Sequence, residues 1–124
     1  MENGQQMTSG RKLENLKIWN DSRVFVKEIY QMMESCHDYG FRDQIQRASV
    51  SIMNNIAEGF ESGSDSLFAR YIQIARGCCS EVKSMLFLCE DFHFCTEEYR
   101  VELHTKLYNI SSGIYKLIQY LNKK

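Results

Sequence analysis

The strongest constraint on the fold is a regular seam of aliphatic residues in the last quarter of the chain. Its members alternate at steps of four and three residues, the spacing that keeps one face of an α-helix turned toward other helices. The 124-residue sequence also contains no proline, so no residue of that type interrupts a long helix. We therefore predict a long helix whose buried face is formed by Leu103, Leu107, Ile110, Ile114, Leu117 and Leu121.

Three earlier segments share this helical period and are separated by short polar breaks. Connections of only three to five residues favour helices that pack as antiparallel neighbours. We predict an all-α fold, an up-down-up-down antiparallel four-helix bundle over residues 13–124, with residues 1–12 as a flexible N-terminal tail. The predicted helices span residues 13–36, 41–61 and 66–91, with Ser64 or Asp65 capping the third, and a fourth that begins near Thr96.

The third predicted helix is more apolar than one face of a bundle requires. Residues 85–89 (MLFLC) are all apolar, so every side of that turn is hydrophobic. A helix in a four-helix bundle normally exposes one side to water, so we expect a second copy of the chain to cover the outer side in a homo-oligomer. The alternative is a broad core with one or two exposed apolar side chains, which is common.

A narrow stripe of polar residues runs along one side of the second predicted helix. Arg47 and Glu58 lie in it about 16 Å apart along the axis, too far to pair with each other. In a tight antiparallel hairpin of the second and third helices, two residues lie opposite each other when their residue numbers add up to about 128. This register predicts an interhelical network that places Arg47 opposite Glu81, Glu58 opposite Arg70, Ser51 opposite Gly77 and Asn55 opposite Gln73, with Asn54 also in the stripe. The alternative is that the stripe binds a ligand or partner.

The sequence offers little for catalysis or metal binding. No Ser or Cys stands in a recognisable nucleophile motif, and the paired Glu-x-x-His motifs of di-iron bundles are absent. Cys89, His93 and Cys95 have zinc-binding side chains, but a structural zinc site needs four ligands. We therefore expect no enzymatic activity, no catalytic residue, no cofactor and no metal.

The cysteine count and the apolar runs bear on the compartment. The five cysteines are an odd number, two of them are adjacent, and no signal peptide precedes them, which is typical of reduced thiols in the cytoplasm. No apolar run approaches the roughly 20 residues of a membrane span. We expect a cytoplasmic protein without a membrane partner.

The charge pattern gives no overall attraction to nucleic acid, because the formal net charge is −1. The best local candidate for nucleic-acid contact is the C-terminal end, where Tyr115 and Tyr120 accompany basic residues that can meet phosphate. The alternative is a solvated helix face. These basic residues are Lys116, Lys123 and Lys124.

Several motifs carry a family resemblance that extends over residues 13–121. They are LKIW at 16–19, QIQRASVSI at 44–52, NIAEG at 55–59 and ARGCCSE at 75–81. In their order and spacing they resemble the four-helix-bundle proteins encoded in intervening sequences of bacterial 23S ribosomal RNA genes. The family motif maps onto Arg47, Asn55, Glu58, Gly59 and Glu81.

The resemblance implies a cytoplasmic bacterial protein that assembles as a ring-like homopentamer. Related members are accessory proteins of reverse transcriptases in diversity-generating retroelements, where they bind the polymerase and nucleic acid. We therefore expect a non-enzymatic, oligomeric interaction or scaffold protein whose main partner is itself. The alternative is a nucleic-acid-binding accessory module that acts through the assembled ring, with RNA, DNA, a ribonucleoprotein or a polymerase as partner.

Overall fold

The computed structural model describes residues 11–123, and the part that it describes contains only helices. This confirms the predicted all-α class, whereas most of the predicted N-terminal tail lies outside the described residues. A short 3-10 turn precedes four α-helices. The elements are η1 (Leu13–Asn15), α1 (Lys17–Met32), α2 (Tyr39–Phe60), α3 (Asp65–Asp91) and α4 (Glu97–Asn122).

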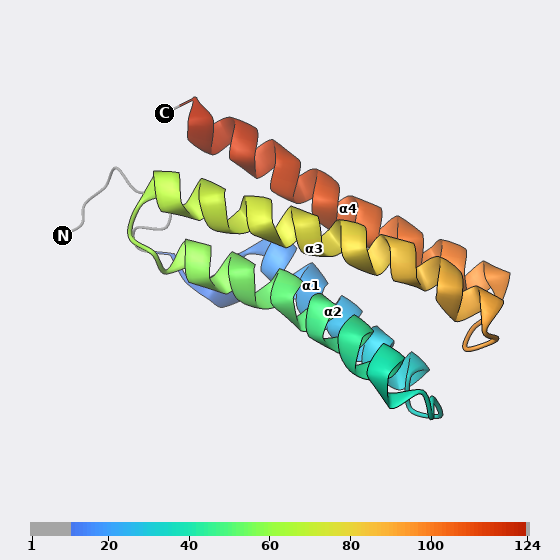
Figure 1. Cartoon of the computed structure of the whole chain (residues 1–124). Coiled ribbons are helices and arrows are strands. Elements are labelled where there is room, and N and C mark those ends of the chain that lie inside the picture. The colour runs from blue at the N-terminus through green and yellow to red at the C-terminus, as the bar shows by residue number, and fades with distance from the viewer. Residues whose placement is uncertain (1–10, 124) are drawn as a thin grey trace.

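The four helices pack side by side around one core. Figure 1 shows the α1–α2 and α3–α4 turns at one end, and the α2–α3 turn, the start of α1 and the end of α4 at the other. Helices α1 and α3 each contact both α2 and α4. The packing therefore leaves every helix with an outer face, and it creates surface grooves where neighbouring helices meet.

Side-chain caps explain where three of the helices begin. Asp38, Ser64 and Thr96 precede α2, α3 and α4, and their side-chain oxygens accept hydrogen bonds from the backbone N–H of Phe41, Leu67 and Tyr99. Each bond satisfies an amide that has no partner within its helix. Of the two residues predicted to cap the third helix, Ser64 does so.

The first predicted helix was wrong in its bounds, because the chain leaves helical geometry at both ends of it. Leu16 is extended (φ −87°, ψ 115°) and separates η1 from α1. At the other end Met33 has a ψ of 0°, and the Cys36 N–H donates to the Met33 carbonyl in a separate turn. This turn buries Met33 more deeply than Met32, the last residue of α1.

Helix α3 ends in a Schellman motif built on a left-handed histidine. His93 has a φ of 64°, the Phe94 N–H donates to the Cys89 carbonyl at 2.8 Å, and the His93 N–H donates to the Glu90 carbonyl at 3.0 Å. The turn brings Phe92 and Phe94 against Phe41 of α2, with ring centroids 6.1 and 5.8 Å from it. Aromatic packing therefore joins the two turns at this end of the bundle.

The core is continuous and draws on all four helices. The α4 seam is buried as predicted except near its end, where Leu117 is half-buried and Ile118 is buried beside it. A straight helix has 3.6 residues per turn, so a strict 3.5-residue seam drifts around it and the next residue moves into the core. Among the described helices, none combines the length and apolar composition that a membrane span needs.

Candidate functional site

The polar stripe of α2 lies on the surface instead of between helices. Arg47 and Glu58 are exposed, as are Arg70 and Glu81 of α3. Neither the Arg47–Glu81 nor the Glu58–Arg70 ion pair forms, because the ion pairs of the described residues involve other side chains. The predicted network of buried interhelical pairs was therefore wrong for these charges. Asn54 is exposed as well.

The predicted register nevertheless brings the right segments together. Arg47, Ser51, Cys78 and Glu81 line one groove between α2 and α3. Within it Glu81 accepts a hydrogen bond from the Gln44 side chain at 3.3 Å. Arg47 forms an ion pair with neither Glu81 nor Asp43, the two acidic residues of the groove. Exposed ions gain little from pairing, since water solvates them and a pair would restrict two long side chains.

Gly77, which the register placed opposite Ser51, is not closely packed, and a close approach of α2 and α3 occurs at Gly59. A Cβ on Gly77 would meet nothing within 4 Å, whereas one on Gly59 would lie 2.9 Å from both Phe68 and Tyr71. The half-buried Asn55 donates locally to the Ser51 carbonyl at 2.8 Å and makes no bond to Gln73. Gly59 of the family motif is thus a point of close contact between α2 and α3.

The outer side of α3 carries three exposed apolar residues, separated by seven and fourteen residues, with Glu81 at the position between the last two. Leu67, Ile74 and Leu88 are 44%, 49% and 40% exposed. They lie on the same side of α3 as Arg70 and Glu81, since residues seven apart differ by only about 20° around a helix. We name these five residues, with Arg47 and Glu58 of α2, the α2–α3 face.

Side chains of the same chain cover most of the apolar turn at residues 85–89. Met85, Leu86 and Cys89 are buried, and Phe87 is partly covered by two side chains of α4. The Arg100 guanidinium carbon lies 4.8 Å from the centroid of the Phe87 ring, and the His104 ring centroid lies 4.6 Å from it. Of that turn, only Leu88 therefore belongs to the α2–α3 face.

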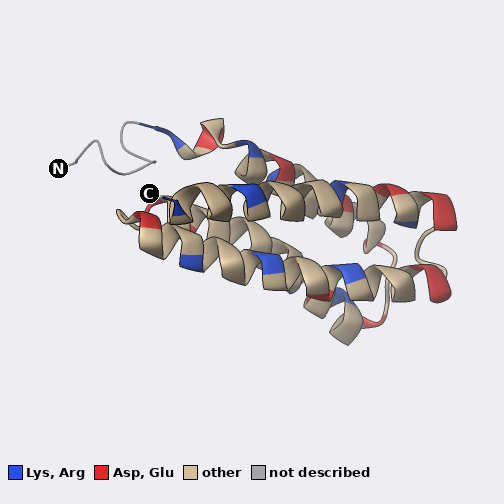
Figure 2. Cartoon of the chain, turned by 90° about the horizontal axis from the view of Figure 1, so that it is seen from above, with Lys and Arg blue, Asp and Glu red and all other residues tan. Residues whose placement is uncertain are grey.

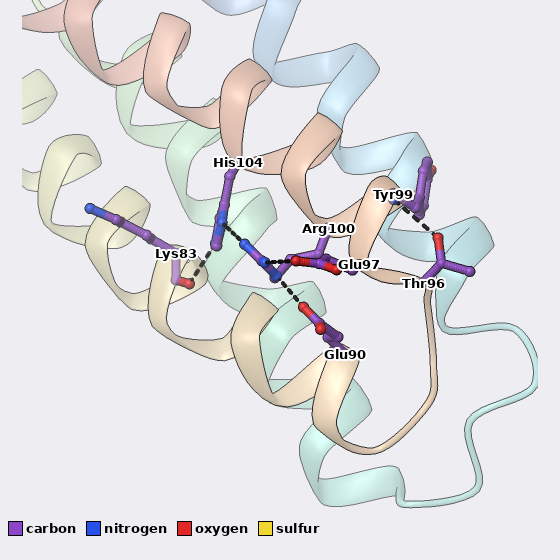
Figure 3. Close-up of polar contacts among 7 residues, drawn as sticks. All are labelled: Lys83, Glu90, Thr96, Glu97, Tyr99, Arg100 and His104. Atoms are coloured by element: carbon purple, nitrogen blue, oxygen red, sulfur yellow. Dashed lines mark hydrogen bonds and ion pairs between the residues drawn. The ribbon is translucent and has the colours of Figure 1, made fainter.

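A second groove, between α3 and α4, contains a chain of polar contacts that the sequence analysis did not identify (Figure 3). Arg100 forms an ion pair with Glu90 and lies 3.9 Å from a Glu97 oxygen. Its Nη1 lies 3.1 Å from His104 Nδ1, and His104 Nε2 lies 3.0 Å from the Lys83 carbonyl oxygen. These contacts fasten the start of α4 to the last turns of α3.

The hydrogen bonds define the tautomer of His104. The Lys83 carbonyl can only accept, so His104 Nε2 carries the hydrogen and donates it. The Arg100 guanidinium can only donate, so Nδ1 accepts. His104 is therefore a neutral imidazole that links Arg100 to the backbone of α3, and it adds no positive charge to the groove.

The groove has a volume of about 600 Å³, and three cationic side chains but no carboxylate are among the described residues that line it. Figure 2 shows the surrounding face, with basic positions along α3 and α4 and acidic residues gathered where the two helices are joined. Residues 66–89 of α3 and 99–123 at α4 together contain seven Lys and Arg and only two Glu. The lining residues are Arg76, Cys79, Ser80, Lys83, Arg100, Val101, His104, Thr105, Leu107, Tyr108 and Ser111.

Sequence reasoning missed this groove, although a signal was present. Arg76, Ser80 and Lys83 follow one another at steps of four and three on the third helix, and Arg100 and His104 are four apart on the fourth. These spacings place polar side chains on one stripe of each helix. Only the packing of α3 on α4 shows that the two stripes border the same groove.

Cys79 and Cys89 are among the buried cysteines. Burial is the main cause that raises the pKa of the Cys79 and Cys89 thiols to about 12, so both remain protonated at neutral pH. His93, which we had considered with Cys89 and Cys95 for zinc, is exposed while Cys89 is buried. Among the described residues, no group of three His, Cys, Asp or Glu side chains is placed to hold a metal ion.

The predicted nucleic-acid contact residues lie near the end of α4. Lys116 and Lys123 are exposed, and so are Tyr115 and Tyr120, whereas Lys124 lies outside the described residues. Tyr115 is in addition 5.0 Å from the Arg76 guanidinium, measured from its ring centroid. Basic and aromatic side chains thus adjoin one another on this part of the surface.

Comparison with known proteins bears on the whole bundle. The model of the 23S rRNA-intervening sequence protein family matches residues 14–116, which extend from η1 into α4. This confirms the family resemblance carried by the sequence motifs. No curated protein matches the chain.

Proposed function

Because the chain belongs to the family of 23S rRNA-intervening sequence proteins, we propose that it is a non-enzymatic interaction protein that acts as a homo-oligomeric scaffold. In this proposal the up-down-up-down bundle assembles through its α2–α3 face into a ring in the bacterial cytoplasm. The family resemblance favours five copies. The scaffold presents repeated, identical surfaces to a partner.

The observation that carries this proposal is the row of Leu67, Ile74 and Leu88 on the outside of α3. Intervals of seven and fourteen residues keep these apolar side chains nearly in line along the helix, which suits packing against a helix of another copy. Gly77, between Ile74 and Glu81, leaves open space where such a helix can approach closely. Single exposed apolar residues are ordinary, but a row of three is not.

The charges of the α2–α3 face support the same proposal. Arg47 and Arg70 are positive, Glu58 and Glu81 are negative, and none of the four forms an ion pair among the described residues. Charges of both signs around an apolar row are typical of a protein interface, where they select the partner and its orientation. A ring also requires this face to contact a different face of the next copy.

Light scattering after size-exclusion chromatography tests the assembly. The wild-type particle should have a mass several times that of the 14.6 kDa chain. Ile74→Asp places a charge in the centre of the row and should give a monomer with an unchanged helical circular dichroism spectrum, because Ile74 is exposed. Ile74→Val is the matched control and should keep the full mass.

Two results would contradict the proposal. A monomeric wild-type protein would remove it altogether. A full-size Ile74→Asp particle would show that another face mediates assembly.

Glu58→Ala adds a milder test, since Glu58 is exposed and forms no ion pair among the described residues. It should leave the folding of a monomeric variant unchanged and weaken assembly.

A second candidate function is nucleic-acid binding, for which the excess of basic residues along α3 and α4, away from the turn that joins them, is the favouring observation. Lys116 and Lys123, next to exposed Tyr115 and Tyr120, are suited to contact phosphates and stack on bases. Binding of labelled single-stranded RNA at low salt, after nuclease treatment of the protein, should weaken in the Lys116→Gln/Lys123→Gln variant. Equal binding by the variant and the wild type would rule out this site.

A further inference from the structure

We propose that the groove between α3 and α4 is a binding site for a small organic phosphate of about the size of a mononucleotide. The site lies within one chain, on residues outside the α2–α3 face. It therefore does not depend on the oligomeric assembly, and the two proposals can fail separately.

The dimensions of the groove suit a small molecule. Its volume is about 600 Å³, within the roughly 300–1,000 Å³ typical of ligand pockets. One wall is α3 with Arg76, Ser80 and Lys83, and the other is α4 with Val101, His104 and Tyr108. Both walls are helices of the packed bundle, so the site is largely formed before a ligand arrives.

Two cations of α3 have charge available for an anion. Lys83 forms no ion pair among the described residues. The Arg76 guanidinium contacts two neutral groups, the Ser111 hydroxyl at 3.4 Å and the Tyr115 ring, and no carboxylate. The two cations are seven residues apart, about 10 Å along the helix, and the Ser80 hydroxyl lies between them on the same stripe. A phosphate group between them would meet two positive charges and a hydroxyl.

Arg100 and His104 form the end wall of the groove on the side of the α3–α4 turn, where the acidic residues lie. Arg100 forms an ion pair with Glu90, and its guanidinium also contacts His104 Nδ1. Both side chains are therefore engaged by protein groups. They act as positioning residues that shape the end wall, while Arg76 and Lys83 bind the anion.

The α4 wall favours a ligand that also has a flat or apolar part. Val101, Leu107 and Tyr108 line it, and Tyr108 is 71% exposed, so its ring is available for stacking. Inorganic phosphate would use only the cations, whereas a nucleotide uses both walls. This combination is why we propose an organic phosphate and not a simple ion.

Isothermal titration calorimetry at low salt tests the site, with AMP and ATP as probes and adenosine as the phosphate-free comparison. AMP and ATP should bind once per chain, and adenosine should bind at least tenfold more weakly. Arg76→Gln and Lys83→Gln should each weaken ATP binding roughly tenfold or more, because each removes a charged contact to phosphate. Lys27→Gln is the control, an exposed cation of α1 outside both the groove and the α2–α3 face, and should bind ATP like the wild type.

Several outcomes would overturn the proposal. It fails if AMP and ATP do not bind, if Lys83→Gln binds as well as the wild type, or if Lys27→Gln loses as much affinity as the groove variants. It also fails if an eight-nucleotide single strand binds in the groove but neither mononucleotide does, since the site would then belong to a nucleic-acid surface. Lys83 Nζ has no ion pair among the described residues, so its variant should fold normally and keeps the test valid if Arg76→Gln unfolds.

Discussion

Glu28 of α1 and Lys106 of α4 form an ion pair across the one helix contact that closes the bundle, with Lys106 Nζ 2.5 Å from Glu28 Oε2. The two residues are 78 apart in the chain. The Glu28 side chain is only 19% exposed, and its other oxygen is buried and lacks a hydrogen-bond partner among the described residues. The carboxylate therefore depends on this lysine.

Removing Lys106 should destabilise the fold. Lys106→Met leaves the Glu28 carboxylate with no partner, and we expect the free energy of unfolding in urea to fall by about 1 kcal/mol, a modest value because the lysine is partly exposed. Lys116→Met, at an exposed position of the same helix, should change it by less than about 0.5 kcal/mol. In a double-mutant cycle with Glu28→Gln, the effects should not add. Additive effects would show that the pair contributes no coupling energy.

Alkaline pH should weaken the folded state. The hydrogen bond with Glu28 is the main cause that raises the pKa of Lys106, and burial is the main cause that raises the pKa of Cys79 and Cys89 from 9.0 to about 12. All three groups hold their protons more tightly in the folded chain than in the unfolded chain. Their contribution is therefore complete below the unfolded pKa values and is lost as pH rises through the folded ones.

Urea unfolding measured between pH 8 and pH 11 checks this expectation. The free energy of unfolding should begin to fall near pH 9, and each buried thiol should contribute a slope of up to about 1.4 kcal/mol per pH unit. The Cys79→Ala/Cys89→Ala variant, although less stable at neutral pH, should show a shallower decline. A decline as steep as that of the wild type would mean that other groups cause it.

Two helical glycines should respond in opposite ways to alanine. Gly59→Ala forces a Cβ to within 2.9 Å of Phe68 and Tyr71 and should cost about 1–3 kcal/mol. Gly77→Ala meets nothing within 4 Å on an exposed helix position and should add about 0.5–1 kcal/mol. Both are to be measured by urea unfolding in the Ile74→Asp background, so that assembly does not contribute. A tolerated Gly59→Ala would show that α2 and α3 can separate at little cost.

The left-handed residue after α3 offers a stabilising change. His93 has a φ of 64°, a region that glycine adopts without steric cost, so His93→Gly should raise the melting temperature by a few degrees, equivalent to about 1 kcal/mol. The opposite kind of change, Gly63→Ala at a φ of 82°, should lower the melting temperature by a similar amount. Thermal unfolding followed by circular dichroism distinguishes the two. A lower melting temperature for His93→Gly would mean that the imidazole makes a stabilising contact.

The parts of the fold that were predictable from sequence depend on neighbours within a few turns of one helix. The apolar period of α4 and the caps at Ser64 and Thr96 are local patterns, and they are present in the structure. The split between η1 and α1 was missed because the apolar period continues through Leu16 although the backbone there is extended. Periodicity reports which side of a segment is apolar, and it does not report a break in the backbone.

The pairing of side chains between helices was decided only by the tertiary structure. Arg47 and Glu81 line one groove as the register predicted, yet water solvates them and they do not pair. Glu28 and Lys106 do pair, although no sequence pattern connects them. By itself the sequence determined the helices, most of their buried faces and the family. The packing of one helix on another decided which charges meet and where grooves form, because a small shift or rotation between helices moves side-chain ends by several ångströms without altering the periodic pattern of either helix.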